Sequence, residues 1–329
     1  MSVTFEKQDG ATVITKENGK PFRILQLTDI HIGGGLFSIK KDKLALAAVE
    51  KIVKAANADF VVVTGDVCYP LWPWSGTFNN MLGTRKFGNL MTKLGVDWTL
   101  VFGNHDTESF AFYDKKHLAK YYKSLPNCHF EEGEAGLTGL GNYHIRLNNE
   151  DGTLNTALMF IDSNSYLGKS FFSGFDVIHD DQIDWYKRTI TKLSDNGKTA
   201  NSLAFFHIPP KEFKEGWEKC YSGSDEATYH LGFVQEKDNY FGYPKTKEGH
   251  FFSEMVNLGS CKGMFMGHDH LNTLSITHQG IRLTYGMSID YLAYKGIKKK
   301  HTQRGGTIIE IFDDGSFDVS LLPLDKIKN

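Results

Sequence analysis

Six short runs of apolar residues recur along the chain, separated by longer mixed segments. Each run is continuous and rich in residues that favour β-structure, which is typical of strands covered on both faces. The runs cover residues 22–27, 60–63, 98–102, 157–161, 203–206 and 264–266. We therefore predict central strands at these positions.

Apolar residues in the intervening segments follow helical spacing. The predicted helices cover residues 41–56, 80–94, 115–124, 181–193 and 249–258. Strands that alternate with helices indicate an α/β fold with crossover connections. At 329 residues, the chain is expected to form a single domain over residues 1–329.

The last part of the chain has a different pattern. Residues 273–285 and 306–322 alternate apolar with polar side chains, and Asp313, Asp314 and Gly315 give a turn signal in the second segment. An antiparallel meander is expected there. Residues 209–249 lack clear periodicity, which predicts a long loop that is functional or disordered.

Five of the six runs stop in residues that bind hard or borderline metals. Because open α/β sheets bind ligands at the carboxyl ends of their strands, these side chains are expected to meet in one crevice. They are Asp29 and His31, then Asp66, then Asn104, His105 and Asp106, then His207, and finally His268 and His270.

Each of these residues has an ordinary alternative, because an Asp after a strand is often a turn former or a helix cap. A converging cluster of carboxylates and imidazoles, however, is costly unless cations neutralise it. The mixture of carboxylate, amide and imidazole suits zinc, manganese or iron. None of the cysteines belongs to the cluster, which disfavours a closed structural zinc site.

The ordered set Asp29-x-His31, Gly65-Asp66, Gly103-Asn104-His105-Asp106, His207 and Gly267-His268-Asp269-His270 resembles the signature of calcineurin-like metallophosphoesterases. The resemblance covers about residues 22–285. The segments HIPPKEF and EGHFF, with RGG at Arg304, are similar to the small single-domain branch that is called purple-acid-phosphatase-like.

The resemblance implies a four-layer αββα sandwich with a β-rich C-terminal part, and it implies roles for individual residues. One metal ion would be held by Asp29, His31, Asp66 and His270. The other would be held by Asn104, His207 and His268, with Asp66 as the bridge. His105 would lie beside the ions as a catalytic residue without binding them.

Three further residues have open roles. Asp106 either fixes the tautomer of a neighbouring imidazole, as part of the catalytic set, or caps the following helix. Tyr69 lies three residues after Asp66, where true purple acid phosphatases have an iron-binding Tyr, but those enzymes have Gly at the position of His31. Tyr69 is therefore either a wall residue or an iron ligand. Asp162 is expected to form a loop or to support the site.

Aromatic residues follow two strand ends, in segments 70–74 and 166–175, and are candidates for pocket walls. Ordinary loop packing is the alternative. The glycines Gly33, Gly34 and Gly35 do not form a phosphate-binding loop fingerprint, because the Lys-Ser/Thr ending is absent.

Charge and composition narrow the possible partners. A net charge of −2 does not favour nucleic acid, although Lys298, Lys299 and Lys300 form a local basic run. The charged N-terminus and the lack of a long apolar run predict a soluble, cytoplasmic protein without a membrane segment. Cys68, Cys128, Cys220 and Cys261 have no paired spacing and are expected to be reduced thiols.

The leading functional hypothesis is hydrolysis of a small-molecule phosphomonoester or phosphodiester by two metal ions (manganese, iron or zinc) that activate a bridging water. A nuclease or cyclic-nucleotide phosphodiesterase is the enzymatic alternative. A noncatalytic protein-binding scaffold with the same fold is the third. The sequence does not specify the substrate or the oligomeric state.

Overall fold

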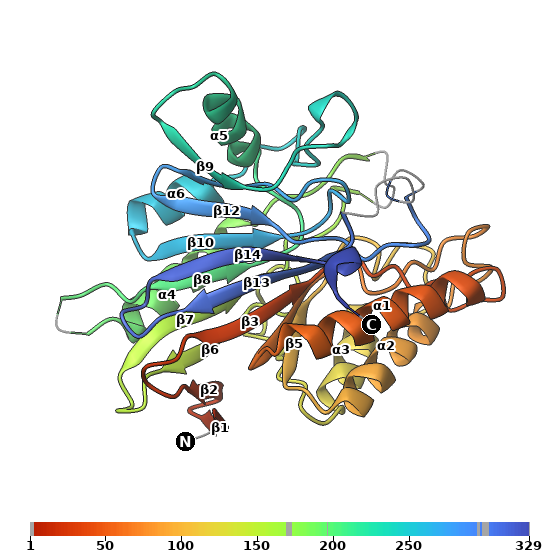
Figure 1. Ribbon diagram of the computed structural model, residues 1–329, viewed down its shortest axis with the longest axis horizontal. Helices are drawn as coiled ribbons and strands as arrows, with labels where there is room; N and C mark the ends of the chain where they lie inside the picture. Colours follow the sequence, from red (N-terminus) through yellow and green to blue (C-terminus); the bar gives the residue numbers. More distant parts are fainter. Residues whose placement is uncertain (1–2, 169–172, 196, 295–296, 298–302, 329) are drawn as a thin grey trace.

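The computed structural model describes residues 3–168, 173–195, 197–294, 297 and 303–328, and it has four layers (Figure 1). Two β-sheets pack face to face between two groups of helices. One outer layer contains α1 (Ile39–Ala56), α2 (Asn80–Leu94) and α3 (Lys115–Lys123). The other contains α4 (Asp180–Leu193), α5 (Lys211–Tyr221) and α6 (Phe251–Leu258). The expected αββα arrangement is confirmed.

The smaller sheet has five strands in the order β14-β13-β3-β4-β5. Its parallel centre consists of β3 (Phe22–Leu27), β4 (Phe60–Thr64) and β5 (Trp98–Val101). A C-terminal hairpin of β13 (Gly305–Ile311) and β14 (Phe317–Pro323) adds to the edge of β3, with β13 antiparallel to it.

The larger sheet has nine strands in the order β1-β2-β6-β7-β8-β10-β12-β11-β9. Strands β7, β8, β10 and β12 form its parallel centre, so their carboxyl ends share one edge. The bounds are β1 (Thr4–Gln8), β2 (Ala11–Thr15), β6 (Tyr143–Asn148), β7 (Leu154–Phe160), β8 (Ser202–Phe205), β9 (Ala227–Leu231), β10 (Cys261–Met266), β11 (Ser275–His278) and β12 (Ile281–Tyr285).

The side chains of β7 show how one strand serves two layers. Leu158 and Phe160 belong to the apolar cluster between the two sheets, whereas Ala157 and Met159 belong to the cluster beneath α4, α5 and α6. Successive side chains of a strand point to opposite faces, so an apolar run without polar interruptions covers both. This explains why the central strands are continuous apolar runs.

Two expectations need correction. The C-terminal strands do not form one meander, because the β11–β12 hairpin joins the larger sheet and the β13–β14 hairpin joins the smaller one. Residues 209–249 are not one long loop, because they contain α5 and β9. The basic run at Lys298, Lys299 and Lys300 lies outside the described residues.

The described part of the chain contains no helix that is long and apolar enough to cross a membrane. All four cysteines are free thiols, as expected.

Candidate metal centre

The predicted metal ligands follow the carboxyl ends of strands in both sheets. Asp29, Asp66 and Asn104 come two or three residues after β3, β4 and β5 of the smaller sheet. His207 and His268 come two residues after β8 and β10 of the larger sheet. The site therefore lies where the parallel centres of the two sheets end, as the sequence predicted for a crevice.

The backbone at these strand ends adopts an uncommon conformation. Asp29, His31, Asp66 and His268 all have positive φ, at 49°, 54°, 53° and 78°. A left-handed residue other than glycine costs of order 1–3 kcal/mol and persists where the surroundings hold it. The backbone at these four residues therefore departs from the extended conformation of the preceding strands.

Two glycines of the motifs are required by close packing of the ligands. A Cβ at Gly103 would lie 2.2 Å from Oδ1 of Asp66, and a Cβ at Gly267 would lie 1.9 Å from Oγ1 of Thr28 and 2.7 Å from Oδ2 of Asp29. Any other residue would push the carboxylates out of place.

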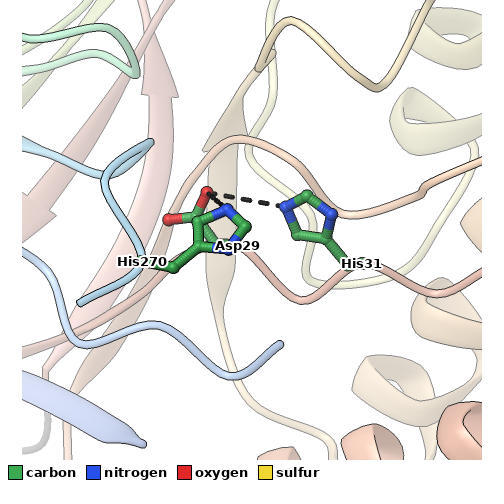
Figure 2. A group of neighbouring side chains, drawn as sticks. All are labelled: Asp29, His31 and His270. Carbon is green, nitrogen blue, oxygen red and sulfur yellow. Dashed lines mark ion pairs between the residues drawn. The ribbon is translucent and has the colours of Figure 1, made fainter. Parts of the chain in front are cut away.

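Asp29, His31 and His270 form one group of ligand atoms (Figure 2). Nε2 of His31 lies 3.6 Å from Oδ1 of Asp29, and Nε2 of His270 lies 3.4 Å from the same oxygen. One carboxylate oxygen of Asp29 thus contacts both rings. His31 and His270 come from loops of different sheets, so this group joins the sheets.

Asp66, His207 and His268 form the second group. Oδ2 of Asp66 lies 3.2 Å from Nε2 of His207, and it also lies 3.4 Å from Nε2 of His31 in the first group. One oxygen of Asp66 therefore faces both groups, which is the geometry that a bridging ligand needs.

The unpaired polar atoms at the site fit bound cations. Within the part of the chain that the structure describes, Oδ2 of Asp66, Oδ1 of Asn104, Nε2 of His207 and both ring nitrogens of His31 are buried without a hydrogen-bond partner. Buried polar atoms are nearly always paired, so a cluster of unpaired ones needs an explanation. All of these atoms belong to side chains that were predicted to bind metal.

Neighbouring imidazoles hold the two central carboxylates of the site in their charged form. Burial alone would raise the pKa of Asp66, but the imidazoles of His207 and His105 hold that pKa well below its usual value. Burial likewise opposes ionisation of Asp29, and His270 and His31 hold its pKa below the usual range. Both carboxylates are therefore anionic, as metal ligands must be.

Two contacts orient the imidazoles of candidate ligands through their other ring nitrogen. Nδ1 of His207 lies 2.7 Å from the carbonyl oxygen of Thr64, and Nδ1 of His270 lies 3.2 Å from Oδ2 of the buried Asp290. Such partners leave the other ring nitrogen for a metal ion. The sequence interpretation did not include Asp290. Its only sequence signal is a position shortly after a β-rich segment.

The predicted catalytic residue His105 is held by a carboxylate that the sequence interpretation missed. Nδ1 of His105 lies 2.6 Å from Oε1 of Glu108, whose side chain is buried. The hydroxyl of Tyr166 donates to the same oxygen at 3.3 Å and accepts from Nδ2 of Asn104 at 2.9 Å. A chain of hydrogen bonds therefore connects the expected metal ligand Asn104 to the ring of His105.

Asp106 differs from both of its expected roles. Its carboxylate accepts hydrogen bonds from the backbone amides of Asp66 (3.0 Å), Cys68 (3.0 Å) and Gly103 (2.8 Å). It thus fixes the loops after β4 and β5 to one another, and these hydrogen bonds run to main-chain amides rather than to an imidazole or a following helix. We correct its assignment from a catalytic residue to a positioning residue.

Tyr69 packs beside the site and is almost buried. Its ring centroid lies 5.1 Å from that of His31 and 4.8 Å from that of His105. Asp162, which the resemblance left without a ligand role, accepts from Nζ of Lys115 at 2.6 Å and from the backbone of Leu140, so it holds a loop.

The two aromatic segments have different surroundings. Phe175 packs its ring against His268, with centroids 4.5 Å apart, and with Tyr240 and Tyr294 it lines an open pocket beside the metal ligands. Trp72 and Trp74 are half exposed instead. Residues 169–172 of the second segment lie outside the described residues.

Comparisons with known proteins agree with this geometry. The family model for calcineurin-like phosphoesterases matches residues 22–272. A relative from Arabidopsis thaliana named "Probable inactive purple acid phosphatase 14" is 28% identical over an alignment of 306 residues that covers 83% of this chain and 71% of the relative. "Phosphatase DCR2" of Saccharomyces cerevisiae is 26% identical over an alignment of 315 residues that covers 84% of this chain and 49% of the yeast protein.

Among solved structures, a dimetal phosphatase from Danio rerio superposes with a TM-score of 0.52 at 12% identity, covering 93% of this chain and 97% of the zebrafish chain. That likeness concerns the fold alone. Together with the family match over most of the chain and the purple-acid-phosphatase relatives, the two ligand groups lead to one assignment. The chain belongs to the calcineurin-like phosphoesterase family, in its purple-acid-phosphatase-like branch.

Proposed function

We propose that the protein is a two-metal hydrolase of small-molecule phosphomonoesters or phosphodiesters. The observation that carries this proposal is the cluster of buried, unpaired ligand atoms around Asp66. Oδ2 of Asp66 lies 3.2 Å from Nε2 of His207 and 3.4 Å from Nε2 of His31 without forming a hydrogen bond to either, and a cation among these atoms would satisfy all three at once.

Asp29, His31 and His270 would hold one cation, and Asn104, His207 and His268 the other, with Asp66 shared. Manganese, iron and zinc all suit these ligands. Such a pair of cations supplies positive charge to the phosphoryl oxygens and makes a water molecule a better nucleophile near neutral pH. Asn104 serves the site in a fixed orientation, because Tyr166 accepts a hydrogen bond from its amide nitrogen.

His105 would contact the reacting phosphoester. Glu108 accepts from Nδ1 and fixes the ring, so Nε2 remains to donate a proton to a phosphoryl oxygen or to the departing oxygen of the ester. The ring is partly exposed, with 24% of its side chain accessible, so a substrate can reach it. The bond that breaks is the one between phosphorus and the leaving oxygen, and the proton from His105 neutralises that oxygen.

The competing proposal is a noncatalytic role, and the printed names of the Arabidopsis relatives favour it, because they include the word "inactive". A cyclic-nucleotide phosphodiesterase or nuclease is the enzymatic alternative. The net charge of −2 supports a small substrate over nucleic acid. The cytoplasm stays our proposed location, and the four free thiols support it.

Metal analysis followed by turnover assays tests the proposal. Protein purified without chelator should contain two ions per chain, and a panel of model monoesters and diesters with each candidate ion should show hydrolysis. Asp66→Asn should lose at least one ion and most of the turnover. Asp151→Asn, in an exposed loop, is the matched control and should keep both its metal ions and its turnover.

Different results would decide against each part. Two bound ions with full turnover in Asp66→Asn would refute the bridging role. His105→Ala should retain the ions but lose at least about a hundredfold in turnover. Unchanged turnover in that variant would remove His105 from the mechanism, and a metal-loaded protein without hydrolysis of any ester would favour the noncatalytic role.

A further inference from the structure

Large apolar side chains are exposed mainly in one region of the surface. Among the described residues, fifteen such side chains are exposed, and nine of these lie in segments 36–44 and 72–82 or at position 112. Monomeric proteins seldom expose clustered apolar groups of this size without a partner. We call these nine residues the apolar rim: Leu36, Phe37, Ile39, Leu44, Trp72, Trp74, Phe78, Leu82 and Phe112.

Direct contacts join the three segments into one surface. The rings of Phe37 and Trp72 lie 5.1 Å apart, and the backbone amide of Phe37 donates to Ser75 at 3.3 Å. The amide of Phe112 donates to the carbonyl of Phe78 at 3.0 Å. These contacts place the loops before α1, α2 and α3 side by side, and the apolar rim spans these loops and the starts of α1 and α2.

The apolar rim borders the candidate metal centre. Its first segment follows His31, and its second follows the run from Asp66 to Tyr69. The backbone of Ile32 pairs with both Val67 (2.9 Å) and Tyr69 (3.0 Å), which holds these loops side by side. A surface that docked on the apolar rim would thus lie next to the metal ligands.

The charges around the apolar rim are positive. Lys40, Lys41 and Lys43 are exposed at the start of α1, and Arg85 and Lys86 lie on α2. Within residues 33–47 and 70–86 the only acidic residue is Asp42, which is buried and receives hydrogen bonds from Gly33, Gly34 and Lys86. The exposed Asp114 near Phe112 is paired with His117. The whole chain carries a charge of −2, so this local excess of cations is not a general property of the surface.

We propose that the apolar rim docks on an anionic lipid bilayer, which places the metal centre at the level of the lipid headgroups. Tryptophan, phenylalanine and leucine surrounded by lysines are typical of surfaces that lie in the membrane interface. The aromatic rings enter the headgroup boundary, and the lysines contact acidic headgroups. A symmetric contact with a second copy of the chain would place the same lysines opposite one another, which opposes that alternative.

Vesicle sedimentation of the full chain, without any substrate, tests this proposal. The wild type should bind vesicles of phosphatidylcholine with phosphatidylserine, should bind pure phosphatidylcholine less, and should be released by high salt. Leu36→Ser with Phe112→Ser should raise the lipid concentration for half-saturation by about tenfold or more. Tyr221→Ser is the matched control, since Tyr221 is 83% exposed on α5 and lies outside the apolar rim.

A second pair of variants tests the electrostatic part. Lys40→Glu with Lys41→Glu should weaken binding to the phosphatidylserine vesicles and should leave binding to pure phosphatidylcholine within about twofold. The Leu36→Ser, Phe112→Ser protein should keep its circular dichroism and its hydrolysis of a soluble phosphomonoester.

Three outcomes would overturn the proposal. The first is that the wild type does not bind vesicles. The second is that Tyr221→Ser loses as much vesicle binding as Leu36→Ser with Phe112→Ser. The third is a concentration-dependent dimer that Leu36→Ser with Phe112→Ser abolishes, with no binding to vesicles. Because docking is measured without turnover, the result is independent of whether the proposed hydrolysis is correct.

Discussion

At the scale of single residues, Glu108 has the clearest role among the residues that sequence reasoning missed. Its buried carboxylate holds His105 through Nδ1 and is connected to Asn104 through Tyr166. A carboxylate in this position keeps the imidazole in one tautomer and orientation. Glu108 is therefore a positioning residue for the proposed proton donor.

Glu108→Gln should lower turnover to an extent that depends on the leaving group of the substrate. An alkyl phosphate needs a proton on its departing oxygen, so its turnover should fall by roughly 10- to 100-fold. A p-nitrophenyl ester leaves without that help, and its turnover should stay within about threefold. Steady-state kinetics with both esters make the comparison, and Glu134→Gln, in an exposed ion pair with Arg188, is the control. An equal fall for both esters would show that the variant damages the site rather than proton donation.

Tyr69→Phe tests whether this residue is a wall or an iron ligand. The Tyr69 ring packs on His31 and His105, so we expect the variant to keep the metal content and the visible absorption of the wild type. The measurement is metal analysis with an absorption spectrum. A purple wild type whose colour disappears in Tyr69→Phe would contradict this expectation.

The motif residues were predictable because each follows a recognisable apolar run, whereas the supporting residues were not. Asp290 is twenty positions from His270 in the sequence and reaches its ring only because the chain after β12 pairs with the chain after β3. The amide of Asp290 donates to the carbonyl of Asp29 at 2.9 Å, which records that pairing. No local sequence pattern predicts a contact between residues so brought together.

At the scale of elements, continuous apolar runs and helical spacing of apolar residues were the reliable signals. Helix α2 has the predicted bounds, and Gly95 ends it with φ of 66° in the left-handed cap. Strand β6 and helix α5 were missed. Strand β6 alternates buried with half-buried residues over only six positions, and α5 is largely polar, with Phe213 and Gly216 as its buried residues. Their packing, rather than their own composition, stabilises them.

Aromatic rings connect the central strands of the larger sheet. Tyr143, Phe160, Phe205 and Phe265 stack in sequence across β6, β7, β8 and β10, with centroids 4.8, 5.3 and 5.1 Å apart. Phe205 has partners on both sides and is fully buried. The ladder faces the smaller sheet, since Phe160, Phe205 and Phe265 belong to the cluster between the sheets.

Phe205→Ala should reduce the free energy of unfolding by about 3–5 kcal/mol, because it removes a buried ring and leaves a cavity. Urea unfolding followed by circular dichroism measures the change. The control is Phe233→Ala, whose side chain is 58% exposed and should cost less than about 1 kcal/mol. Similar losses in both variants would contradict the stabilising role of the ladder.

At the scale of the whole molecule, the candidate metal centre joins the two sheets. Asp29, His31 and Asp66 follow strands of the smaller sheet, and His207 and His268 follow strands of the larger one. The α/β class was predictable from alternation, but the assignment of strands to sheets was not. Strand β13 lies beside β3 although about 280 residues separate them, and only the folded chain brings them together.

Metal ions should therefore stabilise the entire fold. Ions that bind only the native state add about 2.7 kcal/mol at a free concentration of 100 times the dissociation constant. Chelated protein should melt at a lower temperature than protein with added manganese or zinc in differential scanning calorimetry. The difference should shrink in Asp66→Asn. An unchanged melting temperature on chelation of wild-type protein, with the metal shown to be removed, would exclude this coupling.

The left-handed backbone at Asp29, His31, Asp66 and His268 limits which amino acids could ever replace them. Aspartate, asparagine and histidine tolerate positive φ far better than most residues, and all three coordinate metals. Glutamate and cysteine also coordinate metals but lack that tolerance. The main-chain conformation thus limits which metal-binding side chains can stand at these four positions. Substitutions that change the metal preference should be tolerated more readily at His207 or Asn104, whose φ is not positive.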